Sequence, residues 1–378
     1  MKENNIPFLK VRKKDGNQFI KILKNNNNKK PIINHRYKVE HKDDFILFPL
    51  IENPSQLTEI SRKLEKSGIE FKKIRRRGIK NEDYKYKTLE EALENKIPEA
   101  AFQYIPQSYD IIGSIAVVEF KSHEEYSEIP FAIKKAISKA ITQVNKNVNG
   151  VYEKKTKIKG DYRLRELEHL YGDDNTETVY KENSCVFKLD IQHTFFTPRL
   201  VYERNRISNF DYKTGEIIGD LFAGVGPFSI QIAKKHKVNI YAFDKNPEAV
   251  SYLKKNIALN PLRGTVKAYN LNVRDLSNPD NEIGRKLSSK IDRVLMNLPE
   301  RSLEFINIAC YLLKPSGGII HNYQFAENAA PLEIALKRLK SSLKNLDWDL
   351  NKILSKKVVK PYSPKRDLVV IDAYITER

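Results

Sequence analysis

The second half of the chain alternates short apolar runs with amphipathic stretches. From about residue 205, the runs GEIIGDLFA, VNIYAFD, TVKAYNLN, DRVLMNLP and GGIIHNYQF are typical of buried strands. The stretches FSIQIAKKH, EAVSYLKKNIALN and LEFINIACYLL lie among them and carry apolar residues at helical spacing. Strands that alternate with helices predict parallel βαβ units. The fold predicted for residues 205–378 is therefore α/β, with a mostly parallel, doubly wound sheet.

Two smaller α+β domains are predicted before this sheet. Residues 1–78 combine the extended run PFLKVRK, the helical GNQFIKILKN and SQLTEISRKLEKSG, and the strand-like EFKKIRRR, with a polar spacer from Asn25 to Lys30. Residues 79–204 contain the helical KTLEEALEN and SEIPFAIKKAISKAITQVN, followed by strand runs as far as Pro198. The predicted domains are thus 1–78, 79–204 and 205–378, which suits a chain of 378 residues.

The charge of the chain is the first indication of a partner. The formal net charge is +19, from 67 Lys and Arg against 48 Asp and Glu. Such an excess raises the encounter rate with polyanions and favours a nucleic acid or an anionic membrane. A composition rich in lysine throughout would explain the charge without a function, but the cations cluster. The two clusters are Lys72, Lys73, Arg75, Arg76, Arg77 and Lys154, Lys155, Lys157, Lys159. No basic amphipathic anchor favours the membrane, so the predicted partner is a nucleic acid.

Other classes of protein are disfavoured by what the sequence lacks. No apolar run approaches the roughly 20 residues that span a bilayer, and the N-terminus lacks the apolar core of a signal peptide. We therefore expect a cytoplasmic protein without membrane contact, and a monomer. Cys185 and Cys310 are too few for a disulfide framework or a CxxC metal site, so they are expected in the core and no metal site is predicted.

The segment DLFAGVGPF predicts a ligand site at the end of a strand. Asp220 ends the strand, and Gly224 and Gly226 form the turn into the next helix. Glycine is needed there because a side chain would block the approach of a ligand to the backbone. The third glycine of a dinucleotide fingerprint is missing, since Ser229 stands in its place. The turn favours a nucleotide-like ligand over a plain tight turn.

Polar residues also follow the next three strands. Asp244 ends the second strand, 24 residues after Asp220, where an acid can accept the ribose hydroxyls of adenosine. Asn272 to Asp275 end the third strand, and Asn297 and Pro299 end the fourth in the turn MNLPE, which can present an amide to a planar base. Each feature alone is also typical of an ordinary strand end. Together they predict an S-adenosylmethionine site rather than a nicotinamide site, because no polar pair for hydride transfer is present.

Five motifs carry a resemblance to a known family. FFTPRLVYERNRI, DLFAGVGPFSI, YAFDKNPEAV, VLMNLPE and VKPYSPKRDLVVIDAYI closely resemble the tRNA (guanine-N1)-methyltransferases of archaea and eukaryotes, which act at tRNA position 37. The resemblance runs over nearly the whole chain. It implies a class I (Rossmann-like) methyltransferase domain, a middle domain, and an N-terminal module that contacts the tRNA elbow while the catalytic half takes the anticodon loop.

The resemblance assigns roles to particular residues. N1 of neutral guanine carries a proton, so its methylation needs a base for that proton and a positive group for the charge that develops on O6. The family's base falls on Glu203 and its arginine on Arg163, with Arg165 as a close competitor. Asn297 is expected to bind the target base. The implied cofactor residues are Arg204, Asp220, Phe222, Gly224, Gly226, Asp244, Lys245, Asn272, Val273 and Asn297. The implied substrate residues are Arg163, Asn297, Pro299, Arg75, Arg76 and Arg77.

Two residues depart from the family's pattern, and three alternative functions compete with this assignment. Asn272 stands where relatives have an acid on the adenine side, and Phe195 lacks the phenolic hydroxyl of relatives that have tyrosine there. The nearest rival is a wyosine-pathway enzyme that acts on a tricyclic guanosine derivative at position 37, by a further methylation or by aminocarboxypropyl transfer. The intact Glu203 disfavours the second version, and Glu300 disfavours an exocyclic-amine methyltransferase, which has an aromatic residue there. A rival from another class is an RNA-binding protein that has lost turnover.

Overall fold

In the computed structural model, the chain divides into two compact units, residues 1–87 and 88–378. The structure describes residues 5–24, 32–52, 54–120, 129–156 and 160–378; the predicted spacer Asn25 to Lys30 and the cations Lys157 and Lys159 lie outside this part. The first unit extends beyond Gly78, because the segment after that glycine pairs with an earlier one. Lys38 donates its backbone N–H to the Ile79 carbonyl at 2.8 Å, and Asn81 donates to the Arg36 carbonyl at 2.8 Å.

The first unit is an antiparallel sheet covered by two helices, and its mixed content confirms the predicted small α+β fold. The strand order is β2-β3-β1-β4. Phe19 of α1 and Ile60 and Leu64 of α2 pack against Leu9 and Phe48 of the sheet, and together they form a buried core. The elements are β1 (Asn5–Arg12), the 3-10 turn η1 (Lys13–Asp15), α1 (Gly16–Lys24), β2 (Glu40–Lys42), β3 (Phe45–Pro49), α2 (Pro54–Lys66) and β4 (Phe71–Arg77).

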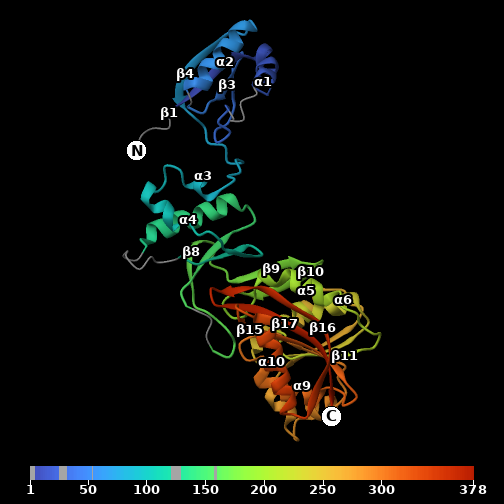
Figure 1. Ribbon diagram of the computed structural model, residues 1–378. Helices are drawn as coiled ribbons and strands as arrows, with labels where there is room; N and C mark the ends of the chain where they lie inside the picture. Colours follow the sequence, from blue (N-terminus) through green and yellow to red (C-terminus); the bar gives the residue numbers. More distant parts are fainter. Residues whose placement is uncertain (1–4, 25–31, 53, 121–128, 157–159) are drawn as a thin grey trace. The chain divides into compact units, whose positions relative to one another are not determined.

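The second unit begins with a four-stranded sheet and a hairpin. The sheet has the order β5-β6-β7-β8, with β6 and β7 parallel and the outer pairs antiparallel. Its elements are α3 (Leu89–Leu93), η2 (Glu99–Tyr104), β5 (Asp110–Ile112), β6 (Ile115–Val118), α4 (Phe131–Val144), β7 (Gly150–Lys154) and β8 (Leu167–Gly172). The hairpin of β9 (Glu177–Glu182) and β10 (Cys185–Asp190) packs on helix α7 (Pro247–Leu259), where the Asn256 and Asn260 side chains bond the backbone of β10. Figure 1 shows this hairpin beside the helices of the large sheet.

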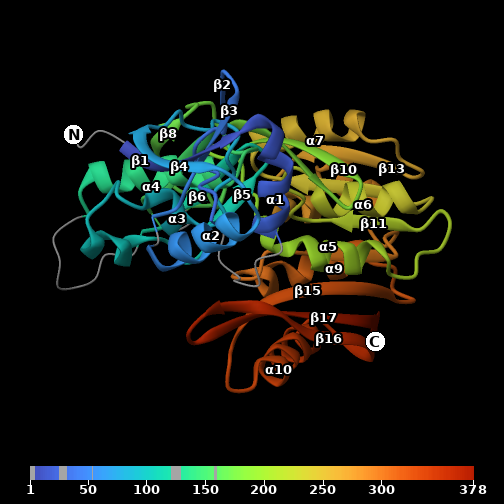
Figure 2. The ribbon, with the colours of Figure 1, turned by 90° about the horizontal axis from the view of Figure 1, so that it is seen from above.

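The large sheet has seven strands in the order β13-β12-β11-β14-β15-β17-β16, which Figure 2 shows running from β13 through β11 and β15 to β16. The pairs from β13 to β15 are parallel, and the pairs of β17 with β15 and β16 are antiparallel. This confirms the predicted mostly parallel, doubly wound sheet. Its elements are η3 (Pro198–Leu200), α5 (Val201–Ser208), β11 (Ile217–Asp220), α6 (Pro227–Lys235), β12 (Asn239–Asp244), β13 (Thr265–Asn270), η4 (Val273–Ser277), α8 (Glu282–Leu287), β14 (Arg293–Met296), η5 (Ser302–Phe305), α9 (Ile306–Leu312), β15 (Gly318–Glu327), α10 (Pro331–Lys344), β16 (Trp348–Ser363) and β17 (Arg366–Glu377).

Alternate residues of the central strands point to two separate cores. In β12, Ile240 and Ala242 join the core formed with α6 and α7, whereas Phe243 joins the core formed with α9 and α10. Such alternation follows from the two-residue period of a strand. Helices cover both faces of the sheet. A ligand can therefore reach the sheet at the ends of its strands, as in other doubly wound sheets. Within the described residues, no helix is long and apolar enough to cross a membrane.

Candidate active site

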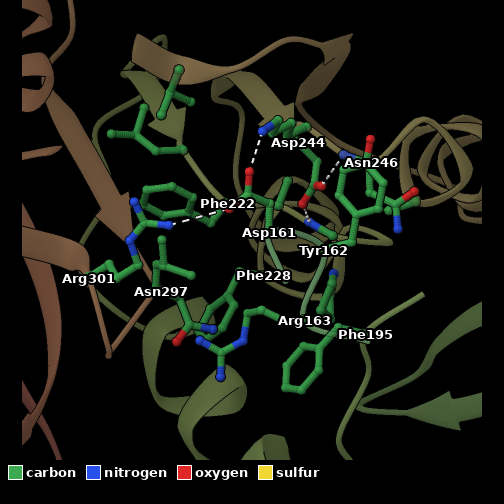
Figure 3. A pocket seen from close by; sticks show the side chains of 18 of the residues that line it. Asp161, Tyr162, Arg163, Phe195, Phe222, Phe228, Asp244, Asn246, Asn297 and Arg301 are labelled. Carbon is green, nitrogen blue, oxygen red and sulfur yellow. Dashed lines mark hydrogen bonds and ion pairs between the residues drawn. The ribbon is translucent and has the colours of Figure 1, made fainter. Parts of the chain in front are cut away.

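A cavity opens at the carboxyl ends of β11, β12, β13 and β14. It encloses about 1150 Å³, including the solvent at its open mouth. Most of the predicted cofactor residues line it, as Figure 3 shows for several of them. These are Arg204, Phe222, Gly224, Asp244, Lys245, Asn272, Val273 and Asn297. The structure thus brings residues from four strand ends into one cavity, which is the arrangement that the motifs predicted.

The glycine turn keeps the floor of this cavity free of side chains. Gly224 and Gly226 have φ of 55° and 90°, which L-residues rarely adopt. A Cβ on Gly226 would lie 2.2 Å from the Leu253 side chain, so Gly226 is needed for packing and does not itself line the cavity. Asp220 is 1% exposed, accepts a hydrogen bond from the Ser229 hydroxyl at 2.7 Å, and does not line the cavity either. Its pKa is raised to about 6 because it is buried.

Asp244 is positioned by backbone donors at the cavity wall. Its two carboxylate oxygens accept hydrogen bonds from the Gly224 N–H at 2.7 Å and the Asn246 N–H at 2.9 Å. Burial raises the pKa of this carboxyl. Each oxygen keeps a lone pair for a further donor. The pair of oxygens therefore suits a ligand with two neighbouring hydroxyls, such as a ribose.

Asp244→Ala is expected to weaken S-adenosylmethionine binding by roughly 1 to 3 kcal/mol, which is the cost of losing charge-assisted hydrogen bonds. The effect on tRNA binding should be small. Calorimetry with each ligand separately measures both affinities. Equal losses for the two ligands would instead show that the substitution unfolds the domain.

Arg163 enters the cavity from a tight turn of the second unit. Arg163 has φ of 57° and its N–H bonds the Gly160 carbonyl at 3.1 Å. Asp161 of the same turn bonds Lys245 and also pairs with Arg301 at 3.4 Å, so the turn is tied to the segments that follow β12 and β14. Figure 3 shows Arg163 beside Asn297. These two ion pairs therefore fix the position of the turn that carries Arg163 relative to the cavity.

The Arg163 guanidinium is left without hydrogen-bond partners. Its Nε and Nη1 atoms are buried and make no hydrogen bond, while the Glu300 carboxylate lies 3.8 Å from Nη1. Burial lowers the pKa of this arginine. Buried donors are almost always satisfied, so orphaned ones at a cavity indicate the place of a ligand acceptor.

A second cavity adjoins the first and shares part of its wall. Arg163, Asn297 and Phe195 line both. The second cavity encloses about 1410 Å³ with its mouth, and Pro299 lies on its wall, as do the aromatic rings of Phe325 and Tyr362. Arg165, the competitor of Arg163, lines only this cavity. Two ligands can therefore meet at Arg163 and Asn297.

Glu203 lies on α5 and lines neither cavity. It is 2% exposed, and it accepts hydrogen bonds from Arg206 at 2.7 and 2.9 Å and from the Tyr323 hydroxyl at 2.7 Å. Arg206 also bonds Asp372 at 2.7 Å. The structure brings Arg163 and Asn297 together but holds Glu203 in this separate buried network.

Arg204 and the basic strand β4 make structural contacts. Arg204 lines the first cavity, but its guanidinium is occupied by the buried Glu182 carboxylate and by the Thr197 carbonyl at 3.1 Å. On β4, Arg75 pairs with Glu52 at 2.6 Å and Arg76 pairs with Glu40 at 3.1 Å. Arg75 and Arg77 are exposed. Among the described residues, no group of three or more His, Cys, Asp or Glu could hold a metal ion.

Sequence reasoning missed several residues of the two cavities. Asp161, Arg301 and Phe305 line the first, and Lys360 and Tyr362 line the second. Arg301 follows MNLPE directly, and Lys360 and Tyr362 lie inside VKPYSPKRD, so their motifs were recognised without the side chains being assigned. No sequence pattern around Asp161 predicted its place in the site, because its partners are distant in the sequence.

The fold and the first cavity define a class I methyltransferase, which takes its methyl group from S-adenosylmethionine. Residues 178–351 match the family described as TRM5/TYW2 methyltransferase domain, residues 89–176 match the TYW2 N-terminal domain, and residues 9–58 match the tRNA methyltransferase 5 N-terminal domain. The tRNA (guanine(37)-N(1))-methyltransferase Trm5b of Pyrococcus abyssi is 34% identical over 90% of this chain and 91% of its own length. The chain therefore belongs to the archaeal and eukaryotic tRNA (guanine-N1)-methyltransferase family, as its motifs predicted.

Solved structures agree with this assignment. The complex of aTrm5 and tRNALeu has a TM-score of 0.69 at 30% identity and covers 97% of this chain and 99% of its own. TYW2 of P. horikoshii, solved with MeSAdo, has a TM-score of 0.62 at 29% identity and covers 77% of this chain and 98% of its own. The likeness to aTrm5 thus extends over nearly the whole chain, and the likeness to TYW2 does not.

The residues of the first cavity fit S-adenosylmethionine. Asp244 offers two acceptors for the ribose hydroxyls, and the turn at Gly224 leaves the backbone open to the ligand. Phe222 and Phe305 form an edge-to-face pair with ring centroids 5.1 Å apart, and with Val273 they give the cavity an apolar wall that suits an adenine ring. The Asn272 side chain already has a partner within its own turn. Its oxygen accepts a hydrogen bond from the Arg274 N–H at 3.2 Å and so caps η4.

Proposed function

We propose that this chain methylates N1 of guanine 37 in tRNA, giving 1-methylguanosine and S-adenosylhomocysteine. The observation that carries the proposal is the orphaned Arg163 guanidinium, which lies with Asn297 on the wall common to two adjoining cavities. Bound in the first cavity, S-adenosylmethionine supplies the methyl group. The second cavity takes the target base, which must leave the anticodon-loop stack to reach it.

Arg163 and Asn297 match the needs of guanine methylation. Negative charge develops on O6 as N1 loses its proton and gains a methyl group. A cation aimed at O6 stabilises that charge, and it is most effective when water and other partners are excluded. The buried Nε and Nη1 of Arg163 make no hydrogen bond and can donate to O6, and the Glu300 carboxylate lies 3.8 Å from Nη1. Asn297 carries an amide that can both donate to and accept from the base edge.

The proposed base is Glu203. It follows Leu200, which lines both cavities, by less than one helical turn. In the structure, the Arg206 guanidinium donates to both carboxylate oxygens of Glu203, at 2.9 and 2.7 Å. Base catalysis by Glu203 therefore requires that, when tRNA binds, the carboxylate gives up one hydrogen bond from Arg206 and accepts the proton of guanine N1. Hydrogen bonds of this kind often tighten only in the substrate complex.

A second candidate is a further methylation of a tricyclic wyosine precursor at the same position. The second cavity favours it, since its mouth is open and a ring system larger than guanine can extend past Pro299 and Tyr362. Aminocarboxypropyl transfer is less well supported, because the likeness to TYW2 covers 77% of the chain and the likeness to aTrm5 covers 97%.

The assay that separates these functions uses two labelled cofactors. S-adenosylmethionine labelled in the methyl group or in the carboxypropyl group is incubated with tRNA, and the nucleosides are analysed. Methyl label in 1-methylguanosine is the expected result. Methyl label in a tricyclic nucleoside supports the second candidate, carboxypropyl label contradicts methylation, and no label supports an RNA-binding protein without turnover.

Removing the first unit, residues 1–87, is expected to weaken tRNA binding while the remaining chain still binds the cofactor. The cut follows the contact boundary, and the unit carries the basic strand from Lys72 to Arg77. Each lost phosphate contact should reduce the slope of log affinity against log salt by about 0.7 to 0.9. Single-turnover transfer against tRNA concentration at two salt levels measures both effects. An unchanged dissociation constant and slope would show that the unit does not contact RNA.

A further inference from the structure

The second cavity holds more cations than its own acids can pair. Its charged wall residues are Lys154, Arg163, Arg165, Arg199 and Lys360 against Asp110 and Glu119. Asp110 is shared by two of the cations, since it bonds Arg199 at 2.6 Å and Lys154 at 3.2 Å. The wall therefore keeps a positive excess.

Arg165 and Lys360 account for most of this excess. Among the residues that the structure describes, neither side chain makes a hydrogen bond or an ion pair, and both are half-buried. Burial lowers the pKa of Lys360, and the nearby Arg199 lowers it further. Burial also lowers the pKa of Arg165. The Asp110 carboxylate raises both pKa values and Glu119 raises that of Arg165, but burial outweighs them. An anionic ligand in the cavity would offset this cost of burying the two charges.

Both cations line the cavity that is the proposed place of the base. Arg165 follows Arg163 by two residues, so it comes from the segment that supplies the O6 partner. Lys360 lies on β16, two residues before Tyr362, whose ring stacks on Phe325 with centroids 3.8 Å apart. The Phe325 N–H bonds the Pro299 carbonyl at 3.1 Å, which ties this aromatic pair to the turn that holds Asn297. A base stacked against this wall would bring its own backbone phosphates into the cavity that the two cations line.

We propose that Arg165 and Lys360 form a subsite for one RNA phosphodiester next to the target nucleotide. The inference rests on the proposed function, because it takes the second cavity as the place of the base. The subsite would hold the nucleotide after it leaves the loop stack. Contacts to phosphate fix the register of RNA on a protein without reading its sequence.

The test combines protein variants with a tRNA in which a single phosphate is neutral. Arg165→Gln and Lys360→Gln remove each charge, and Lys352→Gln is the matched control, an exposed lysine of the same strand outside the cavity. The substrates are unmodified tRNA and tRNA with one methylphosphonate on the 5′ or the 3′ side of nucleotide 37. Affinity at several salt concentrations, cofactor affinity and melting temperature are measured for every protein.

On unmodified tRNA, Arg165→Gln and Lys360→Gln are each expected to weaken binding about 10-fold and to lower the salt slope by about 0.7 to 0.9, and the control should do neither. On tRNA with the neutral phosphate at the contacted position, the same substitutions should cost almost nothing more, because the two changes remove one interaction.

Three results would overturn the subsite: variants that bind unmodified tRNA as the wild type does, losses that stay additive with both neutral phosphates, or a loss of cofactor binding in place of tRNA binding. Failure of the proposed function would appear separately, as wild-type protein that binds tRNA without producing 1-methylguanosine.

Discussion

Glu203→Gln is expected to lower single-turnover methyl transfer by about 100-fold or more, the usual scale for losing a general base. Glutamine keeps the size of the side chain and can still accept the Tyr323 hydrogen bond, but it cannot take a proton from guanine N1. Cofactor affinity should stay nearly unchanged, because Glu203 does not line the first cavity. Rapid-quench methyl transfer at saturating tRNA, together with calorimetry for S-adenosylmethionine, measures the two effects.

The buried network provides the competing explanation and its control. Glu203 also neutralises Arg206, and breaking a buried ion pair is strongly destabilising. Tyr323→Phe removes one hydrogen bond to the carboxylate but leaves its charge and its bonds to Arg206. The base hypothesis requires Glu203→Gln to be far slower than Tyr323→Phe when both folded variants are assayed well below their melting temperatures. If both variants lose stability and cofactor binding in parallel with rate, Glu203 is a structural residue.

The strands and helices that the sequence predicted are those with strong periodic patterns. The runs around Asp220, Asp244 and Asn297 became β11, β12 and β14, because buried parallel strands are continuously apolar and end in polar turns. Helix α10 was not predicted, although its apolar residues Ala335, Leu339 and Leu343 recur every four residues and lie buried. The β16–β17 hairpin was recognised only as a motif, because its exposed strand β16 alternates poorly.

The site was predictable where its residues follow strands and less so where it depends on tertiary contacts. Asp244 and Asn297 occupy strand ends, so topology alone placed them in one cavity. The orphaned state of Arg163 depends on the positive φ of its turn and on ion pairs across the cavity, which no local pattern encodes. The motif around Glu203 was clear, but the network that holds this carboxylate involves β15 and β17, far along the chain.

Arg163→Ala is expected to lower single-turnover methyl transfer by about 100-fold to 1000-fold, as when one donor to a developing oxyanion is removed. The side chain makes no hydrogen bond, and it loses only the long ion pair with Glu300 at 3.8 Å and the contact with the Phe195 ring at 5.0 Å, so the melting temperature should change little. Arg165→Ala is the matched comparison on the same segment, and it should affect tRNA affinity rather than the rate at saturation. Equal losses of rate in the two variants would show that Arg163 has no special part in the reaction.

Asp161 should act on the reaction through Arg163. Its ion pairs with Lys245 and Arg301 are exposed, and pairs of this kind add little stability. Yet they fix the turn that carries Arg163, and small misplacements of a reacting group are costly in rate. Asp161→Ala is therefore expected to slow methyl transfer about 10-fold in the wild-type background and hardly at all in the Arg163→Ala background. Single-turnover rates of the four proteins, with the exposed Asp280→Ala as control, give the coupling. Additive losses would show that Asp161 acts on something other than the placement of Arg163.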